Sequence, residues 1–220
     1  MMLHHAVSVI GGFLGGYTIF NHADIFGNAQ TGNLIKLMLN LCSGDFTFIG
    51  FMFLSFLTYC GGNVFYVLVR RRSKLSMKIV SLIVTSLAVI VVGAIPFVTN
   101  HYIACLPIIF AAPIQWNAYK IAGGNSSSTL FSSNNIRQAT MLLTKYFLDK
   151  DRQTLLKARF YWATLLFFHI GVAFSCFMSI LFGTASIWFC FVPILLSTFA
   201  YYRYESAKYE AAALVNRHTT

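Results

Sequence analysis

Apolar residues occur in long runs along this chain, and short polar segments separate the runs. The hydrocarbon core of a bilayer is about 30 Å thick, so a helix needs about 20 apolar residues to cross it. Six runs are long enough, and we expect each to form one transmembrane helix. They are residues 3–21, 46–69, 76–99, 102–122, 158–182 and 185–204. The pattern predicts an all-α polytopic membrane protein.

Two connections between these runs are too long and too patterned to be simple loops. Each begins with a polar segment and continues as a short amphipathic run, at 34–41 in the first and at 136–147 in the second. The polar segments align where residues 31–34 read Thr-Gly-Asn-Leu and residues 133–136 read Ser-Asn-Asn-Ile. We therefore expect a polar turn and a half-length helix at equivalent places in the two halves.

The order of elements then repeats. Residues 1–99 and 100–204 each contain a span, a polar turn with a half-helix, and two further spans. Three spans per unit make the second unit enter the membrane from the opposite side, as in the inverted repeats of secondary transporters, whose sites lie near the midplane at broken helices. We expect one membrane domain over 1–220, with residues 205–220 as a cytoplasmic tail.

Composition excludes an ordinary soluble domain. The chain is 57% hydrophobic and only 10% charged, whereas soluble domains are about a quarter charged. The net charge of +10 does not indicate a nucleic-acid binder, because the basic residues lie in short connections between apolar runs. No soluble domain and no nucleic-acid partner are expected.

The basic residues instead predict the orientation. If the N-terminus is cytoplasmic, every Lys and Arg except Lys36 falls on the inner side. Lys and Arg are retained on the cytoplasmic side during insertion. We expect both termini in the cytoplasm, and we expect the N-terminal apolar stretch to be the first span rather than a removed signal, because no basic segment precedes it.

Catalytic and metal-binding patterns are missing from the sequence. The five cysteines are scattered singly, without a CxxC pair or a histidine at ligand spacing. The sequence has no GxSxG, HExxH or P-loop motif. We expect no enzyme activity, no cofactor, no metal site and no disulfide.

Two blocks of sequence resemble a known family. Residues 11–18 read GGFLGGYT and residues 28–33 read NAQTGN, and a second block runs from Gln-Trp-Asn-Ala at 115–118 to Asn-Ile-Arg at 135–137. These blocks resemble the bacterial YoaK family, domain of unknown function 1275. The resemblance implies a polytopic protein of the inner or plasma membrane with no settled activity. Many members carry an Asp near the position of Gly15 and Thr-Gly at the position of Ser133-Asn134, so this chain departs from the family at both places.

The two polar turns are the candidate binding site. Thr31 can cap the half-helix, Gly32 allows close backbone approach, and Asn33 can both donate and accept hydrogen bonds. A helix N-terminus at membrane depth presents N–H groups and a partial positive charge, which suits an anionic or strongly polar solute. The same role is expected of Ser133, Asn134 and Asn135. The alternative is that both motifs are ordinary caps on interfacial helices.

Further polar residues near the turns join the candidate site. Gln115 and Asn117 lie within the fourth span and either face a substrate or hold helices together. Arg137 is in the first turn of the second half-helix, where a cation opposes the helix dipole and needs an anionic partner. Lys36 lies on the first half-helix. Glycines at 11–16 and 61–62 are expected to let helices pack closely.

Two ionisable residues are candidates for proton or ion coupling. Asp24 is the acidic residue nearest the first turn, and ionisable groups within membrane segments are functional candidates. Asp24 is alternatively a solvated loop charge. His169, inside the fifth span, can relay protons or is a neutral packing residue.

We therefore expect a small secondary transporter or permease for a polar or anionic solute, in a bacterial plasma membrane. Six spans make a thin wall, so a homodimer is expected. The alternatives are a non-transporting scaffold or sensor, whose basic connections contact anionic lipid, and a channel, which requires a continuous polar stripe.

Overall fold

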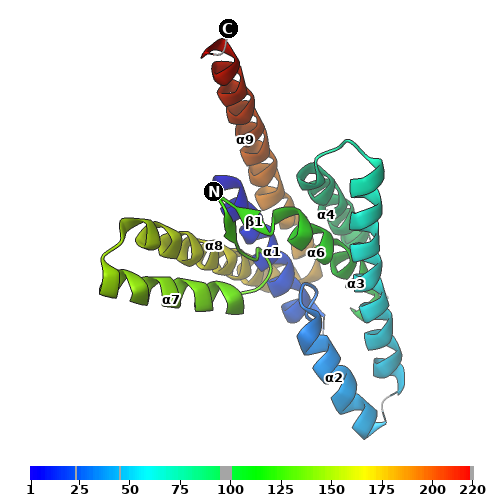
Figure 1. The fold of residues 1–220 in the computed structure, drawn as a ribbon. Coiled ribbons are helices and arrows are strands. Elements are labelled where there is room, and N and C mark those ends of the chain that lie inside the picture. Colours follow the sequence, from blue (N-terminus) through cyan, green and yellow to red (C-terminus); the bar gives the residue numbers. More distant parts are fainter. Residues whose placement is uncertain (23, 45, 95–100, 219–220) are drawn as a thin grey trace.

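The computed structural model describes residues 1–22, 24–44, 46–94 and 101–218, and nearly all of these are helical (Figure 1). The α-helices are α1 (Met2–Asn21), α2 (Gln30–Ser43), α3 (Phe46–Arg72), α4 (Met77–Ala94), α5 (His101–Ala104), α6 (Leu106–Tyr119), α7 (Ser133–Asp149), α8 (Arg152–Phe182) and α9 (Phe191–His218). A 3₁₀ helix, η1 (Gly183–Cys190), joins α8 to α9, and β1 (Ile121–Ala122) pairs antiparallel with β2 (Asn125–Ser126).

Several helices are long and apolar enough to cross a membrane, as the sequence predicts. In the described part of the chain they form four stretches: Met2–Asn21, Phe48–Arg72, Met77–Ala94 and Arg152–Lys208. The last stretch, 57 residues long, contains two of the predicted spans. The all-α class is confirmed, and its apolar helices are compatible with a membrane protein, whereas six separate spans are not confirmed.

The single helix predicted over 102–122 is wrong. The structure divides this segment into α5, α6 and the hairpin of β1 and β2. Pro107 stands in the first turn of α6, where its missing N–H costs nothing. The 14 residues of α6 span only about 21 Å, less than the hydrocarbon core. The end of the predicted third span, residues 95–100, lies outside the described residues.

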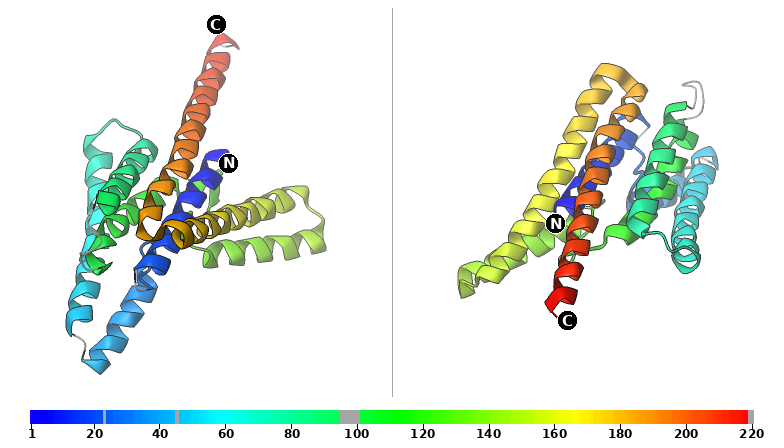
Figure 2. Two further views of the ribbon diagram at one scale, coloured as in Figure 1. Left: turned by 180° about the vertical axis from the view of Figure 1, so that it is seen from behind. Right: turned by 90° about the horizontal axis from the view of Figure 1, so that it is seen from above.

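The chain changes direction between α8 and α9 (Figure 2). Gly183 has φ 55° and ψ −136° at the end of α8, a conformation that side chains rarely allow. The predicted boundary near this glycine is confirmed. Helix α9 then continues to His218, so most of the segment predicted as a tail is part of the last helix.

The two half-length helices are present, and both begin earlier than predicted. Helix α2 begins at Gln30 and α7 at Ser133, so the polar turns supply their first residues. Helix α2 packs against α3, and α7 packs against α8. Both run outward from the middle of the molecule, in different directions (Figure 1).

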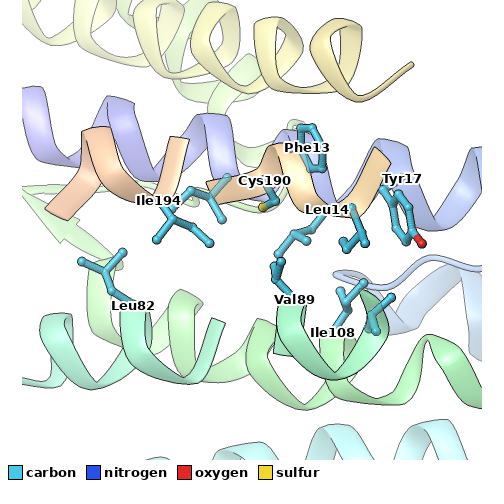
Figure 3. Close-up of a cluster of buried hydrophobic side chains, with 11 residues drawn as sticks. Phe13, Leu14, Tyr17, Leu82, Val89, Ile108, Cys190 and Ile194 are labelled. Atoms are coloured by element: carbon cyan, nitrogen blue, oxygen red, sulfur yellow. The ribbon is translucent and has the colours of Figure 1, made fainter. Parts of the chain in front are cut away.

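The long helices pack in two related sets. Helix α1 contacts α8 and α9, while α6 contacts α3 and α4. A buried apolar cluster joins the sets at the centre (Figure 3). Its labelled members are Phe13, Leu14, Tyr17, Leu82, Val89, Ile108, Cys190 and Ile194.

Glycines allow the closest helix contacts. A Cβ on Gly12 would lie 1.8 Å from the Phe168 carbonyl oxygen, and one on Gly171 would lie 2.1 Å from that of Val9, so α1 and α8 touch through their backbones. A Cβ on Gly62 would lie 2.3 Å from the Phe110 carbonyl oxygen, between α3 and α6. The predicted packing role of these glycines is confirmed at Gly12 and Gly62.

Candidate central polar site

The two polar turns meet inside the molecule. The Asn28 side chain, from the first turn, donates from Nδ2 to the backbone oxygen of Leu130 in the second turn at 3.3 Å, across 102 residues of sequence. The same nitrogen donates to the Gly11 carbonyl of α1 at 3.0 Å. Asn28 and Leu130 are 4% and 3% exposed. The turns and α1 are therefore joined at a buried point.

Helix α6 reaches the same region through Gln115. Its Nε2 donates to the Thr129 hydroxyl at 3.2 Å and to the Val7 carbonyl at 3.3 Å. Both Gln115 and Thr129 are buried. Gln115, predicted as a site residue, thus links α6, α1 and the second turn.

An asparagine closes each turn by the same pair of hydrogen bonds. Asn33 accepts from the Phe26 N–H at 3.1 Å and donates to the Phe26 carbonyl at 2.9 Å. Asn135 accepts from the Ser128 N–H at 3.3 Å and donates to the Ser128 carbonyl at 2.7 Å. In both turns the partner lies seven residues earlier. The structure thus places these two aligned asparagines in equivalent positions, with their amides bound to their own turns.

These contacts belong to a larger set of buried polar residues. We call this set the central polar belt: Thr18, Asn28, Asn33, Gln115, Ser127, Ser128, Thr129 and Asn135. Backbone and side-chain polar groups away from water need partners within the protein. The belt supplies such partners to turns that are not helical, which explains why polar residues are retained inside so apolar a chain.

Two of the predicted site residues at the start of the half-helices, Thr31 and Ser133, lie at the surface. Neither caps its helix, because the N-cap positions are Ala29 and Ser132 without side-chain cap bonds. The capping role predicted for Thr31 is therefore wrong, since α2 begins one residue before it. Gly32 does allow a close approach, because a Cβ there would lie 2.9 Å from the Phe26 ring.

The predicted charged residues are also superficial. Lys36 donates from Nζ to the backbone carbonyl of Asp24 and lies 5.7 Å from the centre of the Phe26 ring. Asp24 is exposed and has a positive φ of 57°. Arg137 is exposed and donates to the Asn134 side-chain oxygen at 3.2 Å. Lys36 and Asp24 come together, but outside the central polar belt.

Two remaining predicted residues have other surroundings. Asn117 donates to Asn63 Oδ1 at 3.0 Å and to its own helix at Pro113 O, so it joins α6 to α3. His169 is exposed on α8, and its Nδ1 is 2.8 Å from the Leu165 carbonyl oxygen. Asn117 is a helix-to-helix contact, and His169 lies outside the belt.

The sequence analysis missed His4 as a site residue. Its Nε2 is 3.1 Å from the Ser127 hydroxyl, and that hydroxyl donates to Asn135 Oδ1 at 2.9 Å. His4 is 3% exposed, and its Nδ1 is buried without a hydrogen-bond partner. Four-residue spacing places His4 on the same face of α1 as Ser8, a buried polar residue. This spacing was the available signal.

Comparison with known proteins places the chain in a family. A family model described as "Protein of unknown function (DUF1275)" matches residues 3–200. The chain belongs to this family. The DUF1275 match extends from α1 into α9 and includes both polar turns, so the resemblance seen in the sequence motifs is confirmed. No curated protein and no solved structure matches the chain.

Proposed function

We propose that this DUF1275 chain is a small secondary transporter for a polar or anionic solute, with its site at the central polar belt. One observation carries the proposal: the two polar turns meet at a buried point through Asn28 and Leu130. Non-helical backbone at membrane depth is characteristic of transporter sites.

The helix contacts support the inverted repeat that the proposal requires. In such a repeat α1 corresponds to α6, α3 to α8 and α4 to α9. Helix α1 packs against α8 and α9, and its counterpart α6 packs against α3 and α4. In the same way α2 packs against α3, and its counterpart α7 packs against α8. Asn33 and Asn135 make equivalent bonds within their turns. A two-unit architecture in which both units meet at their polar turns accounts for these correspondences.

The proposed site works by exchange of hydrogen bonds. Hydrogen bonds join the second turn to the rest of the belt, such as Asn28 to Leu130 and Gln115 to Thr129. When the turns separate, these amides are free to bind a solute, and the N-termini of α2 and α7 add partial positive charge. The buried arrangement described above corresponds to a closed, occluded state.

His4 is the group that we propose for ion coupling, in place of Asp24 and His169. It is a buried histidine whose side chain contacts the belt, through Ser127. An ionisable residue within a membrane segment is costly and is a functional candidate for that reason. Its partner-free Nδ1 can accept a proton when the turns open.

The predicted placement in the cell is part of the same proposal. Lys78, Lys120 and Arg70, all predicted to be cytoplasmic, line one cavity together. Met1 lines an adjoining cavity that shares Lys78. Their gathering at one end supports a cytoplasmic N-terminus in a bacterial plasma membrane. A homodimer stays a prediction, measurable as the mass of the purified protein in detergent.

Uptake into liposomes tests the proposal. The purified protein is reconstituted, and a library of polar and anionic solutes is screened under an inward proton or sodium gradient. Gln115→Leu should reduce uptake of a transported solute by about tenfold or more, because a hydrogen bond lost in a dry site costs on the order of 1–3 kcal/mol. Asn40→Leu is the control, since the Asn40 side chain bonds only to Lys36 O within α2.

A membrane scaffold or sensor is the second candidate. It is favoured by Asn33 and Asn135, whose amides bond to their own turns and leave no obvious vacancy for a solute. Under this candidate no solute moves under either gradient, and Gln115→Leu lowers only the stability of the protein. That outcome would overturn the transporter proposal.

A further inference from the structure

Helices α3, α4 and α6 border a cationic cavity at the end where α3 turns into α4. Its volume is about 300 Å³, near the lower limit of small-molecule sites. Arg70, Lys78 and Lys120 line it, and no carboxylate is among the described residues around it. Three cations without a carboxylate favour an anionic occupant.

Hydrogen bonds between the helices hold the wall of this cavity. The Tyr66 hydroxyl donates to the Asn117 carbonyl at 3.3 Å, and the Asn117 side chain donates to Asn63. The Tyr119 hydroxyl donates to the Lys78 carbonyl at 2.8 Å. The cavity is thus part of the folded structure and is not formed by loose surface side chains.

The start of α4 adds to the preference for an anion. Lys78 is the second residue of α4, and no acidic residue lies in the first turn. A cation at a helix N-terminus opposes the helix dipole, and the free N–H groups there favour negative charge. An anion in the cavity would offset this arrangement and would add to the contact that Lys78 Nζ makes with the Tyr204 ring, 4.0 Å from its centre.

A second cavity lies between the same three helices and is apolar. Its volume is about 330 Å³, and Phe65, Leu87, Ala88 and Phe110 are among its lining residues. On α3, Phe65 comes before Arg70, and on α4, Leu87 and Ala88 come after Lys78. On α6, Phe110 comes before Lys120. The apolar cavity therefore lies on the same side of the cations along each of the three helices. At 1.5 Å per residue it begins roughly 8 to 15 Å from them.

We infer that these two cavities together bind an anionic phospholipid, with its phosphate at Arg70, Lys78 and Lys120 and an acyl chain along the apolar cavity. Basic pockets between membrane helices on the cytoplasmic side bind phosphate-bearing head groups. A soluble phosphate would use the cations but gain nothing from the apolar cavity behind them. The presence of a cationic and an apolar cavity between the same three helices therefore favours a lipid.

Native mass spectrometry of the purified protein in detergent tests the headgroup. Phosphatidylglycerol should bind, and phosphatidylcholine should bind at least tenfold more weakly. Lys78→Gln with Lys120→Gln should weaken phosphatidylglycerol binding about thirtyfold, because each cation near a lipid phosphate contributes about a factor of five. Arg71→Gln with Arg72→Gln is the matched control. It removes the same charge from exposed residues at the end of α3 that do not line the cavity, and should change binding less than threefold.

A second pair of variants tests the acyl chain. Ala88→Phe fills the apolar cavity and leaves the cations intact, so phosphatidylglycerol binding should fall about tenfold. Ile83→Phe, at an exposed site on the same helix, should not change it. Lys120→Gln alone, at an exposed residue, replaces the double variant if the latter does not fold.

Three results would overturn the inference. One is equal binding of phosphatidylglycerol and phosphatidylcholine. Another is a control pair, Arg71→Gln with Arg72→Gln, as damaging as the cavity variants. The third is binding of inorganic phosphate as tight as that of phosphatidylglycerol with no effect of Ala88→Phe, which would assign the cations to a soluble anion.

Discussion

Adjacent glycines in α3 give a sharp test of how the helices pack. A Cβ added at Gly62 would lie 2.3 Å from the Phe110 carbonyl oxygen and 2.6 Å from Pro113 Cγ. A Cβ added at Gly61 would meet only the Phe110 ring, at 3.9 Å, which is an ordinary contact. The two substitutions have the same helix propensity, so a difference between them reports on the contact with α6.

The expected sizes follow from these distances. For Gly62→Ala, α3 and α6 must separate by about 1 Å to restore normal contact, and overpacking of this kind costs about 1–3 kcal/mol. Replacing a helical glycine by alanine contributes about 0.5–1 kcal/mol in the opposite direction. We expect Gly62→Ala to lower the free energy of unfolding by roughly 0.5–2 kcal/mol, and Gly61→Ala to raise it by about 0.5–1 kcal/mol.

Thermal unfolding of the two purified variants in the same detergent measures the difference. For a protein of this size each kcal/mol corresponds to roughly 2–4 °C, so Gly61→Ala should unfold several degrees above Gly62→Ala. Gly171→Ala, at the α1–α8 contact where the Cβ would lie 2.1 Å from the Val9 carbonyl oxygen, should behave like Gly62→Ala. Equal stability of Gly61→Ala and Gly62→Ala would refute the close α3–α6 packing.

Three further predictions concern the second turn and the ends of α8. Asn135→Ala removes the amide bonds to Ser128 and should lower the free energy of unfolding by about 1–3 kcal/mol, whereas Asn134→Ala, whose side chain accepts only from Arg137, should change it by less than about 0.5 kcal/mol; equal effects in chemical unfolding would contradict this. Gly183→Ala should lower the free energy of unfolding by about 1–3 kcal/mol, because the glycine has a positive φ. The control Gly50→Ala, at a glycine with open space around it, should not lower it. Identical melting curves of the two variants would rule out the strained turn. Hydrogen bonds from the Thr154 hydroxyl and from the N–H groups of Gln153 and Thr154 lower the pKa of the Asp151 carboxyl. Because this carboxyl has a lower pKa in the folded protein than in the unfolded chain, where it is about 3.9, its ionised form stabilises the start of α8. This stabilisation is fully present above the unfolded-state pKa and is lost as the pH falls through the folded-state pKa. The protection of the amides of residues 153 and 154 from exchange, taken relative to their intrinsic rates at each pH, should therefore fall only in acid, and unchanged protection down to about pH 2 would contradict the cap.

Apolar run length predicted the membrane class and most helix positions. It failed over residues 102–122, because a count of apolar residues does not register that a new helix starts at Leu106, with Pro107 in its first turn, or that the chain turns at Gly123-Gly124, where both glycines have positive φ. It also placed the start of each half-helix too late, since the polar residues of the turns enter the first turn of α2 and α7. Helix ends depend on local hydrogen bonds that a hydropathy pattern does not contain.

The candidate site was predicted in part. Alignment of the two turns identified Asn33 and Asn135 as equivalent, and the structure gives them the same bonds. The same alignment also selected Thr31 and Ser133, which are exposed, because a match of four residues does not say which side chains point inward. Asn28 and His4 were missed, since their partners lie about a hundred residues away along the chain, and contacts of that kind come only from tertiary packing.

Access of water to Thr129 tests the central claim most directly. Thr129 is 1% exposed and lies at the contact between the second turn and Gln115. In a chain whose five native cysteines are replaced by alanine or serine, Thr129→Cys is treated with a membrane-impermeant maleimide from each side of the membrane. A transporter that opens alternately must expose this position, so we expect labelling from both the cytoplasmic and the external side, with Ser133→Cys as the exposed control and Ser175→Cys as the buried one. No labelling of Thr129→Cys from either side, with the exposed control fully labelled, would contradict the account and leave a static scaffold.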